Sequence, residues 1–141
     1  MVLTLKKKEL AHKMEEKLIY LADDDEDIRA LGERLLTRKG FSTRLFQDGN
    51  SLEAALEKFP QDILAVITDN HMPGLDGIDI VGRFSHLPEY SQTPFIIASS
   101  NHKIKEAALE AGAYALLKKP TEYRKMPEVI KKALNNFRYK I

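Results

Sequence analysis

The feature that most limits the fold of this chain is a regular alternation between short apolar runs and longer stretches of helical periodicity. The apolar runs are rich in β-branched residues and occupy residues 18–22, 41–46, 63–68, 95–99 and 114–117. Each stretch between them carries a single apolar stripe, as a surface helix does. Parallel strands need such helical crossovers, which are right-handed. The sequence therefore predicts an α/β fold, a (βα)5 doubly wound parallel five-stranded sheet with helices on both faces.

Capping and helix-breaking residues mark the ends of the predicted helices. Gly112 follows the fourth helical stretch, and glycine is common at helix C-termini. Asn50 or Ser51 is expected to cap the second helix, and Pro127 is expected in the first turn of the fifth. We expect the third helix over residues 76–86 and the fourth over residues 103–111.

Composition excludes several classes of protein. The chain has 141 residues and no cysteine, which excludes a disulfide framework, a thiolate nucleophile and a cysteine-ligated zinc site. No apolar run is longer than the five residues of 63–67, far short of the ~20 residues of a membrane-spanning helix, and Met1 is not followed by a signal-like segment. We therefore expect a cytoplasmic protein with no membrane partner. One domain is expected over residues 17–138, between an N-terminal extension of residues 1–16 and a C-terminal tail of residues 139–141.

Charge is unevenly distributed along the chain, although the formal net charge is only +1. Residues 23–27 form an unbroken acidic run, whereas residues 118–141 carry eight Lys or Arg against two Glu. No DNA-reading motif accompanies the basic segment. We therefore interpret it as a solvated helix face and expect no nucleic acid binding by this domain itself.

Polar residues with complementary chemistry lie at the carboxyl ends of four predicted strands. Asp23 and Asp24 follow the first strand, Asp69 the third and Lys119 the fifth, and Ser99 ends the fourth. In a parallel sheet these ends share one edge, so the side chains are expected to converge. Crowded carboxylates repel unless a cation lies between them, and oxygen ligands suit Mg²⁺. The pattern predicts a Mg²⁺ site beside a carboxylate that can attack phosphorus and form an acyl phosphate.

Together these residues resemble the receiver domain of two-component response regulators over about residues 17–138. The resemblance rests on IYLADDD at residues 19–25, DNHMPGLDG at residues 69–77, residues 94–99, and residues 112–120 with their final Lys-Pro. The spacing makes it specific: Asp24 and Asp69 are 45 positions apart, Asp69 and Ser99 are 30 apart, and Ser99 and Lys119 are 20 apart.

The resemblance implies a flavodoxin-like fold of strand order 2-1-3-4-5 and a set of ligand roles. Asp69 would accept a phosphoryl group from a phosphohistidine of a sensor histidine kinase or histidine phosphotransfer protein. Asp24 would be the main Mg²⁺ ligand and Asp23 a supporting acid. The backbone carbonyl of His71 would complete the protein ligands of the metal.

The resemblance also implies a switch rather than a multiple-turnover enzyme. Ser99 would be the switch hydroxyl, and Lys119, before a cis Pro120, would bind the phosphoryl group. The domain would catalyse only its own phosphoryl transfer and autodephosphorylation. Its output would be a changed interaction with a protein or domain that the sequence does not identify.

One position departs from the family pattern. Leu116 stands three residues before Lys119, where the family usually has Tyr or Phe. Tyr114, two residues earlier on the same face of the predicted strand, is a candidate substitute. This departure leaves open a phosphorylation-independent, atypical receiver that acts as a protein-docking module. A third alternative, a Mg²⁺-dependent phosphohydrolase, would need a second aspartate two residues after Asp69, where His71 stands.

Overall fold

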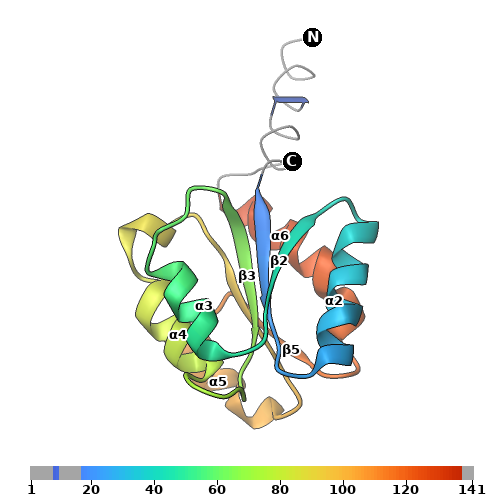
Figure 1. Cartoon of the computed structure of the whole chain (residues 1–141), viewed down its shortest axis with the longest axis vertical. Helices are drawn as coiled ribbons and strands as arrows, with labels where there is room; N and C mark the ends of the chain where they lie inside the picture. The colour runs from blue at the N-terminus through green and yellow to red at the C-terminus, as the bar shows by residue number, and fades with distance from the viewer. Residues whose placement is uncertain (1–7, 10–16, 138–141) are drawn as a thin grey trace.

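A five-stranded parallel sheet forms the centre of the molecule. The computed structural model describes residues 8 and 9 and residues 17–137 (Figure 1), so most of the predicted extension and all of the predicted tail lie outside the described residues. The strands are β1 (Leu18–Ala22), β2 (Ser42–Phe46), β3 (Ile63–Asp69), β4 (Phe95–Ser99) and β5 (Ala115–Lys118). They pair in the order β2-β1-β3-β4-β5. The predicted fold class and the implied strand order are confirmed.

Helices cover both faces of this sheet. They are α2 (Glu26–Arg38), α3 (Gly49–Leu56), α4 (Gly77–Phe84), α5 (Lys105–Ala111) and α6 (Met126–Asn136), with short 3-10 turns η1 (Pro88–Tyr90), η2 (His102–Ile104) and η3 (Tyr123–Lys125). The helices α2 and α6 pack on one face and α3, α4 and α5 on the other (Figure 1). Right-handed crossovers require this division, because the chain moves from β1 to β2 in one direction and then returns past β1 in the other. No helix among the described residues is long and apolar enough to cross a membrane.

The predicted helix ends are partly correct. Gly112 ends α5 with a φ of 119°, and Pro127 lies in the first turn of α6, as predicted. The predicted cap of α3 is wrong: the carboxylate of Asp48, and not Asn50 or Ser51, caps this helix by accepting the backbone N–H of Ser51 at 2.7 Å. The helix starts two residues earlier than an Asn50 cap would allow, because Gly49 already has helical geometry.

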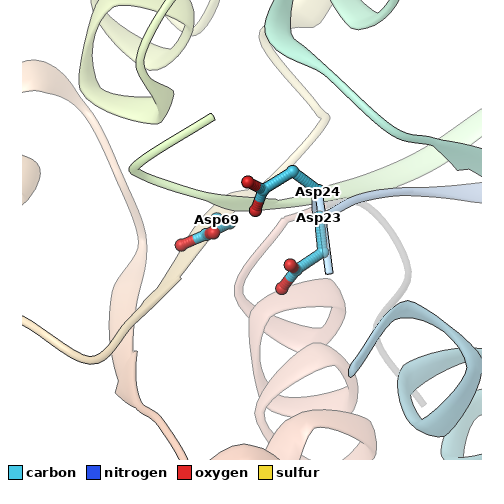
Figure 2. Close-up of side chains that lie close together, drawn as sticks. All are labelled: Asp23, Asp24 and Asp69. Carbon is cyan, nitrogen blue, oxygen red and sulfur yellow. The ribbon is translucent and has the colours of Figure 1, made fainter. Parts of the chain in front are cut away.

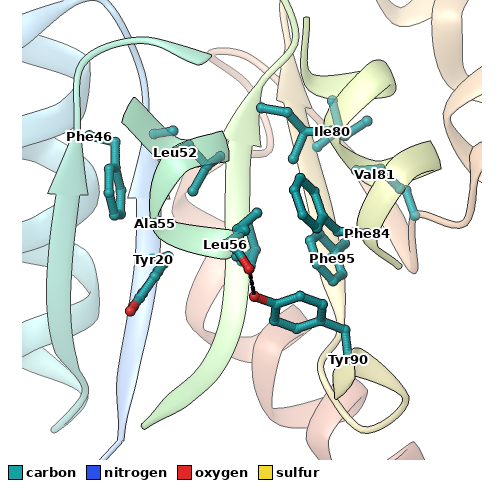
Figure 3. Packing of buried hydrophobic residues seen from close by; sticks show 14 of the residues in the cluster. Tyr20, Phe46, Leu52, Ala55, Leu56, Ile80, Val81, Phe84, Tyr90 and Phe95 are labelled. Atoms are coloured by element: carbon teal, nitrogen blue, oxygen red, sulfur yellow. Dashed lines mark hydrogen bonds between the residues drawn. The ribbon is translucent and has the colours of Figure 1, made fainter. Parts of the chain in front are cut away.

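The larger hydrophobic cluster fills the space under α3, α4 and α5 (Figure 3). Tyr90 of η1 lies at its margin, with its ring edge-to-face against Phe84 at 6.0 Å and Phe95 at 5.7 Å between centroids. Its hydroxyl donates to the backbone carbonyl of Leu56 at 2.5 Å. Burial raises the pKa of Tyr90, so the phenol keeps its proton and remains a donor. This contact joins the turn before β4 to α3.

Strand register sets the position of the functional edge. All seven residues of β3 are buried, as the sequence predicts for a central strand. Thr68 pairs with Ala22 of β1, and Asp69 pairs with Ala98 of β4. The residues that follow β1 and β4 therefore lie level with the end of β3, at the point where the strand order reverses.

Two glycines of α4 provide a test of how tightly this edge is packed. A Cβ at Gly77 would lie 2.5 Å from the backbone oxygen of Asp69, whereas the nearest atom to a Cβ at the exposed Gly82 would be 3.9 Å away. We expect Gly77→Ala to destabilise the fold by about 1–3 kcal/mol, because backbone must move. Gly82→Ala should stabilise it by up to about 1 kcal/mol through helix propensity. Urea unfolding of both variants would check this pair, and equal stabilities would contradict it.

Candidate functional site

Three carboxylates meet at the carboxyl edge of the sheet. Asp23 and Asp24 follow β1 directly, and Asp69 is the last residue of β3. Figure 2 shows these side chains close together, and each offers a carboxylate oxygen within 4.8 Å of the other two. Asp23 and Asp69 are buried, whereas Asp24 is exposed. The convergence predicted from the strand ends is therefore present.

The ammonium group of Lys119 joins two of these carboxylates. Its Nζ lies 2.9 Å from Oδ2 of Asp23 and 3.3 Å from Oδ1 of Asp69. The lysine side chain is only 13% exposed, and the two carboxylate side chains are 2% and 10% exposed, so solvent screens these ion pairs weakly. Lys119 follows β5, two strands away from β3, and its peptide bond to Pro120 is cis, as the resemblance implied.

Burial and charge shift the ionisation of this pair. Burial raises the pKa of Asp69 above its ordinary value, and the charge of Asp23 adds to that rise, although the Lys119 ammonium opposes it. For Lys119, burial alone would lower the pKa, but the hydrogen bond to Asp23 and the charges of both carboxylates outweigh it and raise the pKa. The lysine is therefore held in its charged form beside Asp69.

The loop after β1 is shaped by its own acidic residues. Oδ1 of Asp23 accepts the backbone N–H of Asp25 at 2.9 Å, and the carboxylate of Asp25 caps α2. Arg29, in the first turns of that helix, donates from Nη1 to the backbone carbonyl of Asp23 at 2.7 Å. Asp25 is thus structural. Asp24, between the two, has no hydrogen bond or ion pair within residues 17–137, which leaves its carboxylate available to a ligand.

The loop after β3 is tied to α4. The carbonyl of Asn70 accepts the backbone N–H of Gly77 at 2.9 Å, and its side-chain oxygen accepts that of Ile78 at 3.0 Å. Gly74 has a φ of 87°, which favours glycine, and a Cβ there would meet the side chain of Asn50 at 2.5 Å. The Met-Pro-Gly segment therefore forms a tight turn that fixes the backbone beyond Asp69.

Ser99 connects the fourth and fifth strands at the same edge. It is 4% exposed, and its Oγ accepts the backbone N–H of Asn101 at 3.0 Å. Its backbone carbonyl accepts the N–H of Lys119 at 2.9 Å. A movement of the serine hydroxyl would therefore break or shift its hydrogen bond to Asn101 and change the position of the loop that leads to η2.

These groups line one cleft of about 620 Å³. All the residues expected at the site line it, namely Asp23, Asp24, Asp69, His71, Ser99 and Lys119. Sequence reasoning missed two neighbours with structural roles. Asn70 follows Asp69 directly, so its place next to a predicted site residue could have indicated its role in fixing the loop after β3. The contact of Arg29 with the carbonyl of Asp23 left no signal, since it depends on how α2 packs.

The donors of the cleft suit a hard divalent cation. Mg²⁺ prefers oxygen ligands at 2.0–2.1 Å, so two oxygens bound to one ion lie about 3–4 Å apart. Carboxylate oxygens within 4.8 Å of one another can reach such positions by small side-chain rotations. Asp23, Asp24 and Asp69 carry three negative charges against the single ammonium of Lys119, and this imbalance also favours a cation.

The usual aromatic position near the site is filled by a buried leucine. Leu116 of β5 is 7% exposed and packs in the cluster under α3, α4 and α5. The suggestion that Tyr114 takes its place is wrong. Tyr114 lies before β5 and packs on the opposite face, where its hydroxyl accepts a hydrogen bond from Asn136 at 2.8 Å and its ring lies 6.4 Å from that of Phe137. The alternation of a strand does not apply to a residue outside it.

Comparison with known proteins gives consistent matches. The family model described as the response regulator receiver domain matches residues 19–131. The DNA-binding transcriptional regulator NtrC of Salmonella typhimurium is 28% identical over 126 residues, which cover 88% of this chain and 26% of that protein. The transcriptional regulatory protein FixJ of Bradyrhizobium diazoefficiens is 34% identical over 120 residues, covering 82% of this chain and 56% of that protein.

Solved structures match at the level of the fold. A response regulator receiver domain protein from Clostridium thermocellum gives a TM-score of 0.75 at 24% identity, over 85% of this chain and 95% of that one. Compared with the two transcriptional regulators named above, the chain spans about a quarter of the length of NtrC and a little over half of the length of FixJ.

Proposed function

The chain belongs to the family of response regulator receiver domains, and from that premise we propose that Asp69 accepts a phosphoryl group and so switches protein–protein interactions. One observation carries the proposal: Asp69 ends the central strand, beside two further carboxylates and in contact with the Lys119 ammonium. Receiver domains are signalling switches, so we assign no multiple-turnover reaction to this chain.

The transfer is a substitution at phosphorus. A carboxylate oxygen of Asp69 forms the new P–O bond, while the P–N bond to the phosphohistidine of a kinase or phosphotransfer protein breaks and its electron pair stays on the imidazole. Lys119 supplies an ammonium that can hydrogen-bond to a phosphoryl oxygen, and Ser99 supplies a hydroxyl in the same cleft. In autodephosphorylation, water attacks the phosphorus, the P–O bond to Asp69 breaks, and inorganic phosphate leaves while the Asp69 carboxylate is regenerated.

Mg²⁺ is the cofactor that we assign to the cleft. Asp24, Asp23, Asp69 and the backbone carbonyl of His71 would hold it. When bound, it would offset the charge that builds up as a dianionic phosphoryl group approaches the carboxylates. The exposed Asp24 is the carboxylate most available for this role, because those of Asp23 and Asp69 are already engaged by Lys119.

Further features of the proposal concern the whole protein. We assign the receiver unit to residues 17–138, with residues 1–16 and 139–141 outside it. NtrC and FixJ are named as transcriptional regulators, and both are longer than this chain, so an output protein or domain is the expected partner. A cytoplasmic location, where a sensor kinase can reach the domain, is part of the same proposal.

Phosphorylation can be tested by intact mass measurement after incubation with Mg²⁺ and acetyl phosphate. We expect one phosphoryl group to be added. When EDTA has removed the metal before the phosphodonor is added, we expect no mass gain. Asp69→Asn should abolish the mass gain because the nucleophile is gone. Asp62→Asn, an exposed position just before the other end of β3, is the matched control and should retain it. A gain that persists in Asp69→Asn would place the acceptor elsewhere.

A phosphorylation-independent docking module is the second candidate, favoured by Leu116 alone. In that case the parent chain would gain no mass with Mg²⁺ and phosphodonor. A phosphohydrolase would instead release inorganic phosphate from a phosphoester over many turnovers.

The presence of Leu116 in place of an aromatic residue also predicts which residues move when Asp69 is phosphorylated. A phosphoryl oxygen on Asp69 should draw the Ser99 hydroxyl inward and shift the following loop, because only a contact made in one state biases a two-state equilibrium. Leu116 is packed in the core and has no ring or hydroxyl to follow that movement. We therefore expect backbone NMR shifts on beryllofluoride binding to be large at Ser99 and Ser100 and small at Leu116 and Leu117. Comparable shifts at all four would contradict this view.

A further inference from the structure

The side chain of Arg29 reaches from α2 to the backbone that carries Asp23 and Asp24. Its Nη1 donates to the carbonyl of Asp23 at 2.7 Å. Among the residues that the structure describes, no carboxylate lies within ion-pair distance of Arg29, although residues 23–27, just before it in the sequence, form an acidic run. A cation is also unfavourable near a helix N-terminus, where the helix dipole is positive. The stability of α2 alone therefore does not account for an arginine at this position.

Both peptide groups that flank Asp24 are held by hydrogen bonds. The guanidinium of Arg29 binds the carbonyl of the first, which joins Asp23 to Asp24. The carboxylate of Asp23 accepts the N–H of the second, from the backbone nitrogen of Asp25, at 2.9 Å. Because each peptide group is planar, these two contacts restrict the backbone rotations on either side of Asp24. The exposed Asp24 carboxylate therefore projects from a backbone that is fixed on both sides.

Rigid placement of a ligand has different consequences for two common divalent cations. Mg²⁺ demands near-octahedral geometry with oxygens at about 2.0–2.1 Å, whereas Ca²⁺ accepts more oxygens at about 2.3–2.6 Å in flexible arrangements. A carboxylate on a mobile loop can therefore still bind Ca²⁺ but loses more of its affinity for Mg²⁺. Outer contacts that orient metal ligands commonly change metal affinity by about 10–100-fold.

We propose that Arg29 is a positioning residue that raises the preference of the acidic cleft for Mg²⁺ over Ca²⁺, acting through the carbonyl of Asp23 on the backbone of Asp24. This inference rests on the proposed function, because it takes the cleft as the metal site. A guanidinium has no acceptor atom to bind a metal, so Arg29 acts through the backbone. Its positive charge by itself would weaken the binding of both cations to a similar extent. The ratio of the two affinities therefore separates the effect of position from the effect of charge.

The test measures the affinity of the full chain for Mg²⁺ and for Ca²⁺, each from backbone NMR shifts during a titration at constant ionic strength. We expect Arg29→Met to bind Mg²⁺ about tenfold more weakly and Ca²⁺ less than about threefold more weakly. Arg29→Lys keeps a charged donor of similar reach and should recover most of the Mg²⁺ affinity. Arg34→Met, at an exposed position of the same helix, is the matched control and should bind both ions as the parent does.

Equal losses for both ions in Arg29→Met, or no loss, would overturn the inference and leave the proposed metal site intact. A parent chain without saturable shifts for either ion would contradict the metal site itself, and the inference with it. If Arg29→Met fails to fold, ¹⁵N relaxation of the metal-free parent decides: the Asp24 amide should be as rigid as the amides of β1, and a mobile amide would contradict positioning by Arg29. These measurements use no phosphodonor, so they are independent of whether Asp69 is phosphorylated.

Discussion

The contacts of the Lys119 ammonium with Asp23 and Asp69 are the interaction on which the functional edge depends. They join the carboxyl ends of β1, β3 and β5, strands that are far apart in the sequence. Without the ammonium, two buried carboxylates would face each other uncompensated, which is strongly destabilising. With it, and with Asp24 nearby, two negative charges still lack a partner. The edge is therefore stable as folded but remains receptive to a divalent cation.

Many residues of this edge were predictable because each is identified by its immediate neighbours in the sequence. Each strand end is marked in the sequence by a switch from apolar to polar residues, and parallel strands bring such ends together. Five site residues could thus be assigned to one edge without knowledge of any side-chain direction, namely Asp23, Asp24, Asp69, Ser99 and Lys119. The strand order itself came from the resemblance to a family, since alternation alone does not specify which strands are neighbours.

The remaining features depended on tertiary packing. Tyr114 was assigned to the face of Leu116 by strand alternation, but β5 begins only at the next residue and the ring turns toward α6. The cap of α3 was misplaced because Asp48 is one of several polar residues before that helix, and only backbone geometry distinguishes them. The contact of Arg29 with the carbonyl of Asp23 could not be predicted, because it depends on how α2 packs against the end of β1.

The central claim is that Lys119 holds the carboxylates at rest and the phosphoryl group after transfer. Its most direct test is the affinity for beryllofluoride in the presence of Mg²⁺, measured by ¹⁹F NMR for the parent, Lys119→Met and Lys118→Met. A charge-assisted hydrogen bond of about 1.5–3 kcal/mol predicts that Lys119→Met binds at least about tenfold more weakly. The neighbouring Lys118 is exposed, and its replacement should have no effect. Equal affinities for the parent and Lys119→Met would contradict the account.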